Sequence, residues 1–122
     1  MARAIVAKTT LEGAYGDYGA GEADVVLTAA DVANFNYAMF KTGDIVIAHN
    51  TDVAAQTVTI TSIEDDQGRT GNIATYSLAA DDIAVFGPFE RNGWMQDDGQ
   101  LYMRATSANV KLGVITGASV RG

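Results

Sequence analysis

The chain has 122 residues, of which 48% are hydrophobic and 19% charged, and this composition fits one globular domain. Fifteen acidic against eight basic residues give a net charge of −7, and the basic residues occur singly, which argues against nucleic acid and anionic membranes as partners. The absence of cysteine excludes disulfides and thiolate chemistry. The first eight residues contain no long apolar run, so we expect no signal peptide or membrane span, and a cytoplasmic product.

The N-terminal part of the chain is rich in glycine. Residues 9–24, TTLEGAYGDYGAGEAD, contain four glycines and two tyrosines, and neither helical nor strand periodicity is present. The sequence therefore predicts an extended N-terminal arm over residues 1–23, followed by one folded domain over residues 24–122.

One segment near the start of that domain is compatible with two structures. Thr28, with Asp31 three residues later, resembles a helix N-terminus, and Val32, Phe35 and Phe40 have loosely helical spacing. The alternative for residues 28–40 is a turn at Asp31–Asn34 followed by a strand. The sequence alone leaves both open.

From Asp24 onward, short apolar runs alternate with turn residues about every 8–12 positions, which is typical of a β-sandwich or barrel. Within the last run, Val110, Leu112 and Val114 fall on one face of a strand. We predict an all-β domain of about eight strands. The runs cover residues 24–29, 35–40, 44–50, 56–63, 72–78, 82–89, 100–106 and 109–116.

The sequence offers little for catalysis, so we predict no catalytic residue, no metal, no cofactor and no enzyme activity. His49 is the only histidine, and its expected place is a hydrogen-bonded position at the sheet rim, on the face of Ile45 and Ile47 if those residues point to the core. Two acidic clusters, at residues 64–68 and 97–100, have the oxygen ligands that calcium prefers, but acid-glycine clusters are also common turns.

Aromatic residues gather after the strand predicted at residues 82–89. Phe86 precedes Gly87-Pro88, which breaks the strand, and Phe89, Trp94 and Tyr102 follow. An exposed platform of Phe89, Trp94 and Tyr102 would stack on sugars. The favoured alternative is that these aromatic residues fill the end of the core or a contact between subunits.

The order of these segments resembles the capsid decoration (cement) proteins of tailed bacteriophages. The resemblance lies in VLTAADVAN, TGDIVIAHNT, QTVTITS, GRTGNIATYSLAADDIAVFGPF, GWMQDDGQLYM and NVKLGVIT, and extends from about residue 24 to the end. It implies a jelly-roll-like β-sandwich on the virion surface. It also implies a homotrimer that bridges major capsid protein subunits and an N-terminal arm that contributes to this contact.

Within the arm, we expect Arg3, Tyr15 and Tyr18 to contact the capsid, because tyrosines give a large contact area with few rotatable bonds. Two other functions stay open at this point. One is an accessory protein of the phage tail or neck, and the other is a carbohydrate-binding β-sandwich module.

Overall fold

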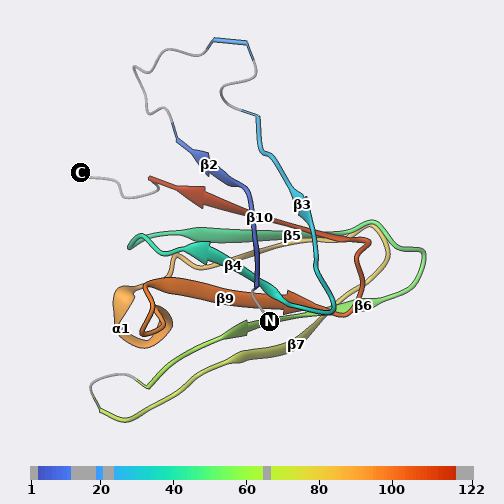
Figure 1. Ribbon diagram of the computed structural model, residues 1–122. Coiled ribbons are helices and arrows are strands. Elements are labelled where there is room, and N and C mark those ends of the chain that lie inside the picture. Colours follow the sequence, from blue (N-terminus) through green and yellow to red (C-terminus); the bar gives the residue numbers. More distant parts are fainter. Residues whose placement is uncertain (1–2, 12–18, 21–23, 65–66, 118–122) are drawn as a thin grey trace.

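The computed structural model describes residues 3–11, 19–20, 24–64 and 67–117, in which ten strands form two mixed sheets (Figure 1). The first sheet has the order β1 (Ala4–Ile5), β4 (Asn36–Met39), β9 (Gln100–Ala105), β6 (Gln56–Thr61) and β7 (Ile73–Leu78). The second has the order β2 (Lys8–Thr10), β10 (Val110–Thr116), β5 (Ile45–Asn50) and β8 (Ile83–Phe86), with β3 (Thr28–Ala29) also paired to β10.

The predicted all-β sandwich is confirmed, and each of the eight predicted runs contains one strand, from β3 to β10. Residues 28–40 form the second of the two alternatives, a turn at residues 32–34 followed by β4. In the described residues the helical structure is one short element, α1 (Arg91–Trp94), in the connection between β8 and β9.

The core lies between the sheets, where alternate residues of facing strands are buried. Val110, Leu112 and Val114 of β10 are at most 1% exposed, as their spacing predicts. In β5, however, Val46, Ala48 and Asn50 face the core, so the expectation for Ile45, Ile47 and His49 is wrong: these three lie on the outer face.

A polar residue can occupy the inward end of β5 because its hydrogen bonds are satisfied. The Asn50 amide nitrogen donates to the carbonyl oxygens of Leu78 and Ala54, each at 2.9 Å, and its side-chain oxygen accepts from the Asp52 amide. Sequence periodicity carries no information about these hydrogen bonds, one of which joins Asn50 to Leu78, 28 residues away, and therefore it does not indicate that Asn50 is buried.

The start of the predicted arm differs from expectation, because residues 4–10 belong to the sandwich. The backbone crosses from the first sheet, where β1 runs parallel to β4, to the second, where β2 runs parallel to β10. Between them Val6 is buried in the core, 2% exposed. The short connection thus ties the two sheets together at one edge.

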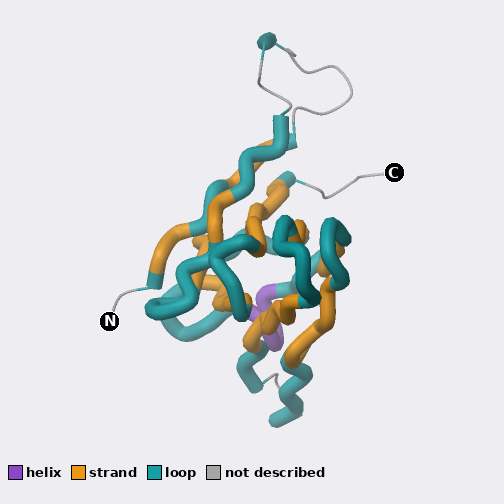
Figure 2. Tube along the Cα trace, turned by 90° about the vertical axis from the view of Figure 1, so that its right-hand side faces the viewer, coloured by secondary structure: helices purple, strands orange, loops and turns teal. Residues whose placement is uncertain are grey.

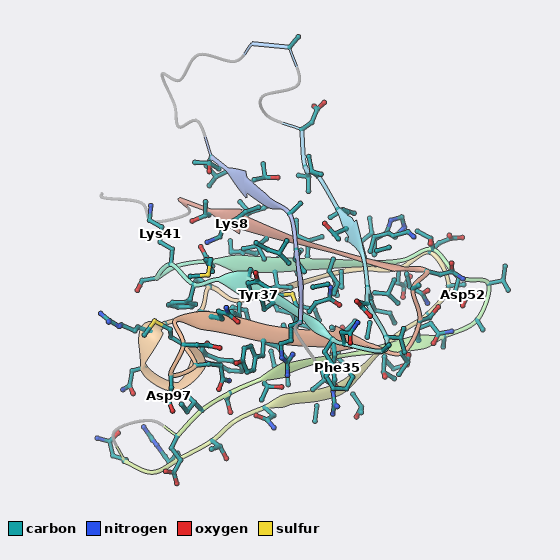
Figure 3. All side chains as sticks on the ribbon, in the orientation of Figure 1. Lys8, Phe35, Tyr37, Lys41, Asp52 and Asp97 are labelled. Atoms are coloured by element: carbon teal, nitrogen blue, oxygen red, sulfur yellow. The ribbon has the colours of Figure 1, made fainter. Side chains whose placement is uncertain are left out.

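An ion pair reinforces this crossing. The side chain of Lys8 is labelled in Figure 3. Its ammonium lies 3.0 Å from Asp44 Oδ2, and it also donates to the Met39 carbonyl at the end of β4. The Asp44 side chain is fully buried, and its second oxygen, Oδ1, has no hydrogen-bond partner in the described residues. Burying a carboxylate costs free energy unless a cation accompanies it. Lys8 therefore stabilises the folded domain and is not part of a free arm.

The chain after Asp24 crosses closely over β10. A Cβ placed on Gly113 would lie 2.6 Å from Leu27 Cδ2 and 3.0 Å from the Val26 carbonyl oxygen. The Val26 amide also donates to Thr9 Oγ1, so this segment and β2 project side by side from the second sheet (Figures 1 and 2). Glycine at 113 is what allows the segment to lie on the sheet.

We predict that Gly113→Ala lowers the free energy of unfolding by about 1–3 kcal/mol, because the added methyl group overpacks against Leu27 and a backbone carbonyl. Urea denaturation measures the change. Gly71→Ala is the control, since a Cβ there meets nothing within 4 Å. Equal stability of the two variants would contradict the close crossing.

Lys8→Met is expected to lower the free energy of unfolding by about 3 kcal/mol, because it keeps the apolar stem but leaves Asp44 buried without a cation. Adding Asp44→Asn to this variant removes the uncompensated charge and recovers part of the loss. Lys41→Met, at an exposed lysine, serves as the control in the same urea experiment and should change stability by less than about 0.5 kcal/mol. The interpretation fails if both lysine variants behave alike.

Candidate functional site

The four aromatic residues singled out from the sequence separate into two groups. Phe86 and Phe89 are buried, 7% and 3% exposed, and the half-buried Trp94 packs against the core. The ring centroids of Phe89 and Trp94 are 4.7 Å apart, so this pair closes one end of the sandwich. Tyr102 instead lies on the outer face of the first sheet, because its neighbours Leu101 and Met103 face the core.

The sugar-stacking platform of Phe89, Trp94 and Tyr102 is therefore not formed. The ring of Phe89 is covered by the core and cannot present its face to a ligand. Phe86 is likewise occupied, since Tyr76 of β7 packs edge-on against it with centroids 5.2 Å apart. These aromatic residues serve packing between the sheets.

A different cluster forms on the outer face of the first sheet, and we call it the cationic stack: Arg3, Phe35, Tyr102 and Arg104. The Arg3 guanidinium carbon lies 3.9 Å from the centroid of the Tyr102 ring and 5.4 Å from that of Phe35. The guanidinium carbon of Arg104 lies 5.1 Å from the Phe35 centroid. Two cations thus share one aromatic ring.

Arg3, predicted from the sequence as an arm contact, is held in this stack rather than projecting from the domain. Its Nη1 donates to the Asn36 carbonyl oxygen at 3.1 Å. Burial lowers the pKa of the Arg3 guanidinium from its ordinary value, and the nearby charge of Arg104 acts in the same direction. Tyr15 and Tyr18, the other two predicted contacts, lie outside the described residues.

The turn before β4 positions Phe35. The Asp31 carboxylate accepts hydrogen bonds from the Ala33 and Asn34 amides, and the Phe35 amide donates to the Asp31 carbonyl oxygen. The hydrogen bond from the Asn34 amide is the main cause that lowers the pKa of Asp31. Phe35 then adopts φ +66°, a strained value for a bulky residue, and its ring reaches both arginines.

Beside the cationic stack the surface is hollowed into a groove of about 270 Å³, which we call the threonine groove. It lies over strands β6, β7 and β9 and the turn before β4. Its lining combines one aromatic ring, one guanidinium, small apolar groups and hydroxyls. The lining residues are Val32, Phe35, Thr57, Thr59, Thr75, Arg104, Ala105 and Thr106.

An irregularity between β6 and β7 shapes the far wall of this groove. The register of the two strands shifts between Val58 and Ile60. At this point Thr75 has φ +49°, and its amide donates to Thr59 Oγ1 at 3.1 Å instead of to a strand carbonyl. Bulges of this kind often lie next to binding sites, because they redirect side chains at a sheet surface.

The lining groups suit binding rather than covalent chemistry. Among the described residues that line the threonine groove there is no histidine, carboxylate or lysine that would activate a nucleophile. His49 lies on the outer face of the second sheet, where Lys111 and Ile83 are its cross-strand neighbours. Its imidazole makes no hydrogen bond to any described residue, contrary to the expected rim contact.

The acidic clusters considered for calcium are placed only in part. Asp65 and Asp66 lie outside the described residues, and Asp98 accepts a hydrogen bond from the Tyr102 hydroxyl. Among the residues that the structure describes, no group of three or more histidine, aspartate or glutamate side chains gathers as a metal site would require. The described helix is also too short to cross a bilayer.

Comparison with models of protein families, with curated proteins and with solved structures gave no match to this chain. The site therefore rests on its own geometry. Sequence reasoning missed that Phe35 contacts both Arg3 and Arg104. The alternation in residues 100–106 does place Tyr102 and Arg104 on one face, but the arrival of Arg3 from the other end of the chain is a tertiary contact.

The Tyr102 phenol should ionise above its ordinary pKa, because its hydrogen bond to Asp98 favours the protonated form. An unfolded tyrosine has a pKa of about 10, and below that pH the stabilisation from this bond is fully present. It is lost as the pH rises through the higher pKa that Tyr102 has in the folded chain. Asp98→Ala is expected to move the pKa of Tyr102 down. Asp97→Ala removes a neighbouring charge but leaves the hydrogen bond to Asp98, so it should lower the pKa of Tyr102 by less. NMR of the tyrosine ring carbons as a function of pH measures both pKa changes.

Proposed function

We propose that the protein is a structural component of a tailed-bacteriophage particle, which decorates the outer surface of the head and cements major capsid protein subunits as a homotrimer. The proposal is carried by the order of strands and turns that resembles decoration proteins. Support comes from the sandwich itself, in which all eight predicted strand segments occupy consecutive strands.

The second sheet offers a surface suited to such a contact. Its outer side carries five aliphatic residues, Ile45, Ile47, Ile83, Val85 and Ile115, which we call the apolar face. Ile83 and Val85, on the edge strand β8, are each 63% exposed. Exposed apolar groups that share one sheet face are typical of a protein–protein contact.

A tail or neck accessory protein is the second location compatible with this proposal. The same apolar face would then contact a different protein of the particle. Binding to purified heads separates the two, because a tail protein has no saturable site on the shell. Sedimentation of the free protein tests the trimer independently.

We expect the purified protein to co-sediment saturably with expanded capsids that lack it, and to bind unexpanded shells less. The paired substitution Ile83→Ser and Val85→Ser should weaken binding at least about tenfold, since it removes apolar contact area without disturbing the core. Co-sedimentation at increasing protein concentration gives the affinity.

Val53→Ser is the matched control, because Val53 is 94% exposed but lies in the loop after β5 rather than on the apolar face. It should bind as the unchanged protein does. Saturable binding that the paired substitution leaves intact would move the contact to another surface, and absence of binding to either shell would contradict a role on the head.

A further inference from the structure

The threonine groove contains several groups whose hydrogen-bonding capacity is unused. Arg104 is exposed, and its guanidinium lies over the Phe35 ring but makes no hydrogen bond and no ion pair to any described residue. The hydroxyls of Thr57 and Thr75 likewise have no hydrogen-bond partner among the described residues. These donors and acceptors point to a ligand that is both charged and polar.

The charge of that ligand follows from the cationic stack. Two guanidinium groups flank Phe35, although the chain as a whole carries a net charge of −7. At physiological ionic strength, charges beyond about 8 Å are largely screened, and Arg104 is the one charged side chain among the described residues that line the groove. A planar carboxylate matches a guanidinium by two parallel hydrogen bonds.

The other lining residues indicate the chemistry of the uncharged part of the ligand. The Phe35 ring, Val32 and the threonine methyl groups give apolar contact beside the free hydroxyls. A pyranose ring has the same mixture, with C–H faces that pack on an aromatic ring and hydroxyls around its edge. At about 270 Å³ the groove is smaller than the roughly 300–1,000 Å³ typical for drug-sized ligands, and so it fits about one sugar unit.

We propose that the threonine groove binds an acidic sugar, a uronate unit of a polysaccharide, with Arg104 on the carboxylate and Thr57 and Thr75 on the ring hydroxyls. The strained backbone of Phe35 and of Thr75 is consistent with this role, since both residues line the groove. This site is separate from the apolar face, and it depends neither on the proposed capsid contact nor on the aromatic platform that the structure excludes.

The test is an NMR titration of the isotope-labelled full chain with sodium glucuronate. We expect saturable shifts of the Phe35, Thr59, Thr75 and Arg104 amides, with a dissociation constant on the order of 1 mM. Glucose, which lacks the carboxylate, and acetate, which lacks the ring, should each bind at least about tenfold more weakly.

Arg104→Gln should weaken glucuronate binding at least about tenfold, and Thr57→Val about threefold, through loss of one hydrogen bond. Arg91→Gln is the control, because it removes an equal charge at α1, outside the groove. The amide spectrum of each variant reports that it is folded. Absence of saturable shifts up to about 20 mM glucuronate, binding of acetate equal to that of glucuronate, or full binding by Arg104→Gln would each overturn the proposal.

Discussion

The burial of one carboxylate constrains the architecture of this protein more than any other single contact. Asp44 sits in the turn that leads into β5, and its side chain is fully buried. A charge in that position requires a partner, and Lys8 supplies it from a segment 36 residues earlier in the chain. The N-terminal strands must therefore lie across the corner of the sandwich, where β1 extends one sheet and β2 the other. The hydrogen bond from Lys8 to the Met39 carbonyl brings the end of β4 into the same junction.

This junction also determines where the surfaces for binding lie. Because residues 4–10 are held against the sheets, Arg3 lies on the outer face of the first sheet, where its guanidinium contacts the rings of Tyr102 and Phe35. The segment that returns before β3 is directed over β10, where Gly113 leaves room for Leu27. The two outer faces consequently differ in chemistry. One carries guanidinium, aromatic and hydroxyl groups, and the other carries aliphatic side chains on β5, β8 and β10. Two surfaces of such different character are suited to different partners.

The candidate site was only partly predictable. Tyr102 and Arg3 were both singled out from the sequence, but for separate reasons and in separate roles, and nothing in the spacing of residues 3 and 102 indicates that they stack. Phe35 was read as one position of a possible helix, whereas the Asp31 turn places its ring between two arginines. Thr75 lines the groove because the register of β7 against β6 shifts at this point. That shift depends on how the two strands pair, and the residues of β7 alone do not indicate it.

The sequence by itself determined the all-β class and the positions of eight strands, because apolar alternation and turn residues are local signals that each strand carries in its own residues. It also determined that Val110, Leu112 and Val114 form one buried face. Only the tertiary structure decided which face of β5 turns inward, since that choice depends on the Leu78 carbonyl group of β7, which accepts a hydrogen bond from the Asn50 side chain. The same holds for the N-terminal strands. Residues 4–10 form two short strands in two different sheets because β4 and β10 offer them unpaired edges and Lys8 pairs with the buried Asp44.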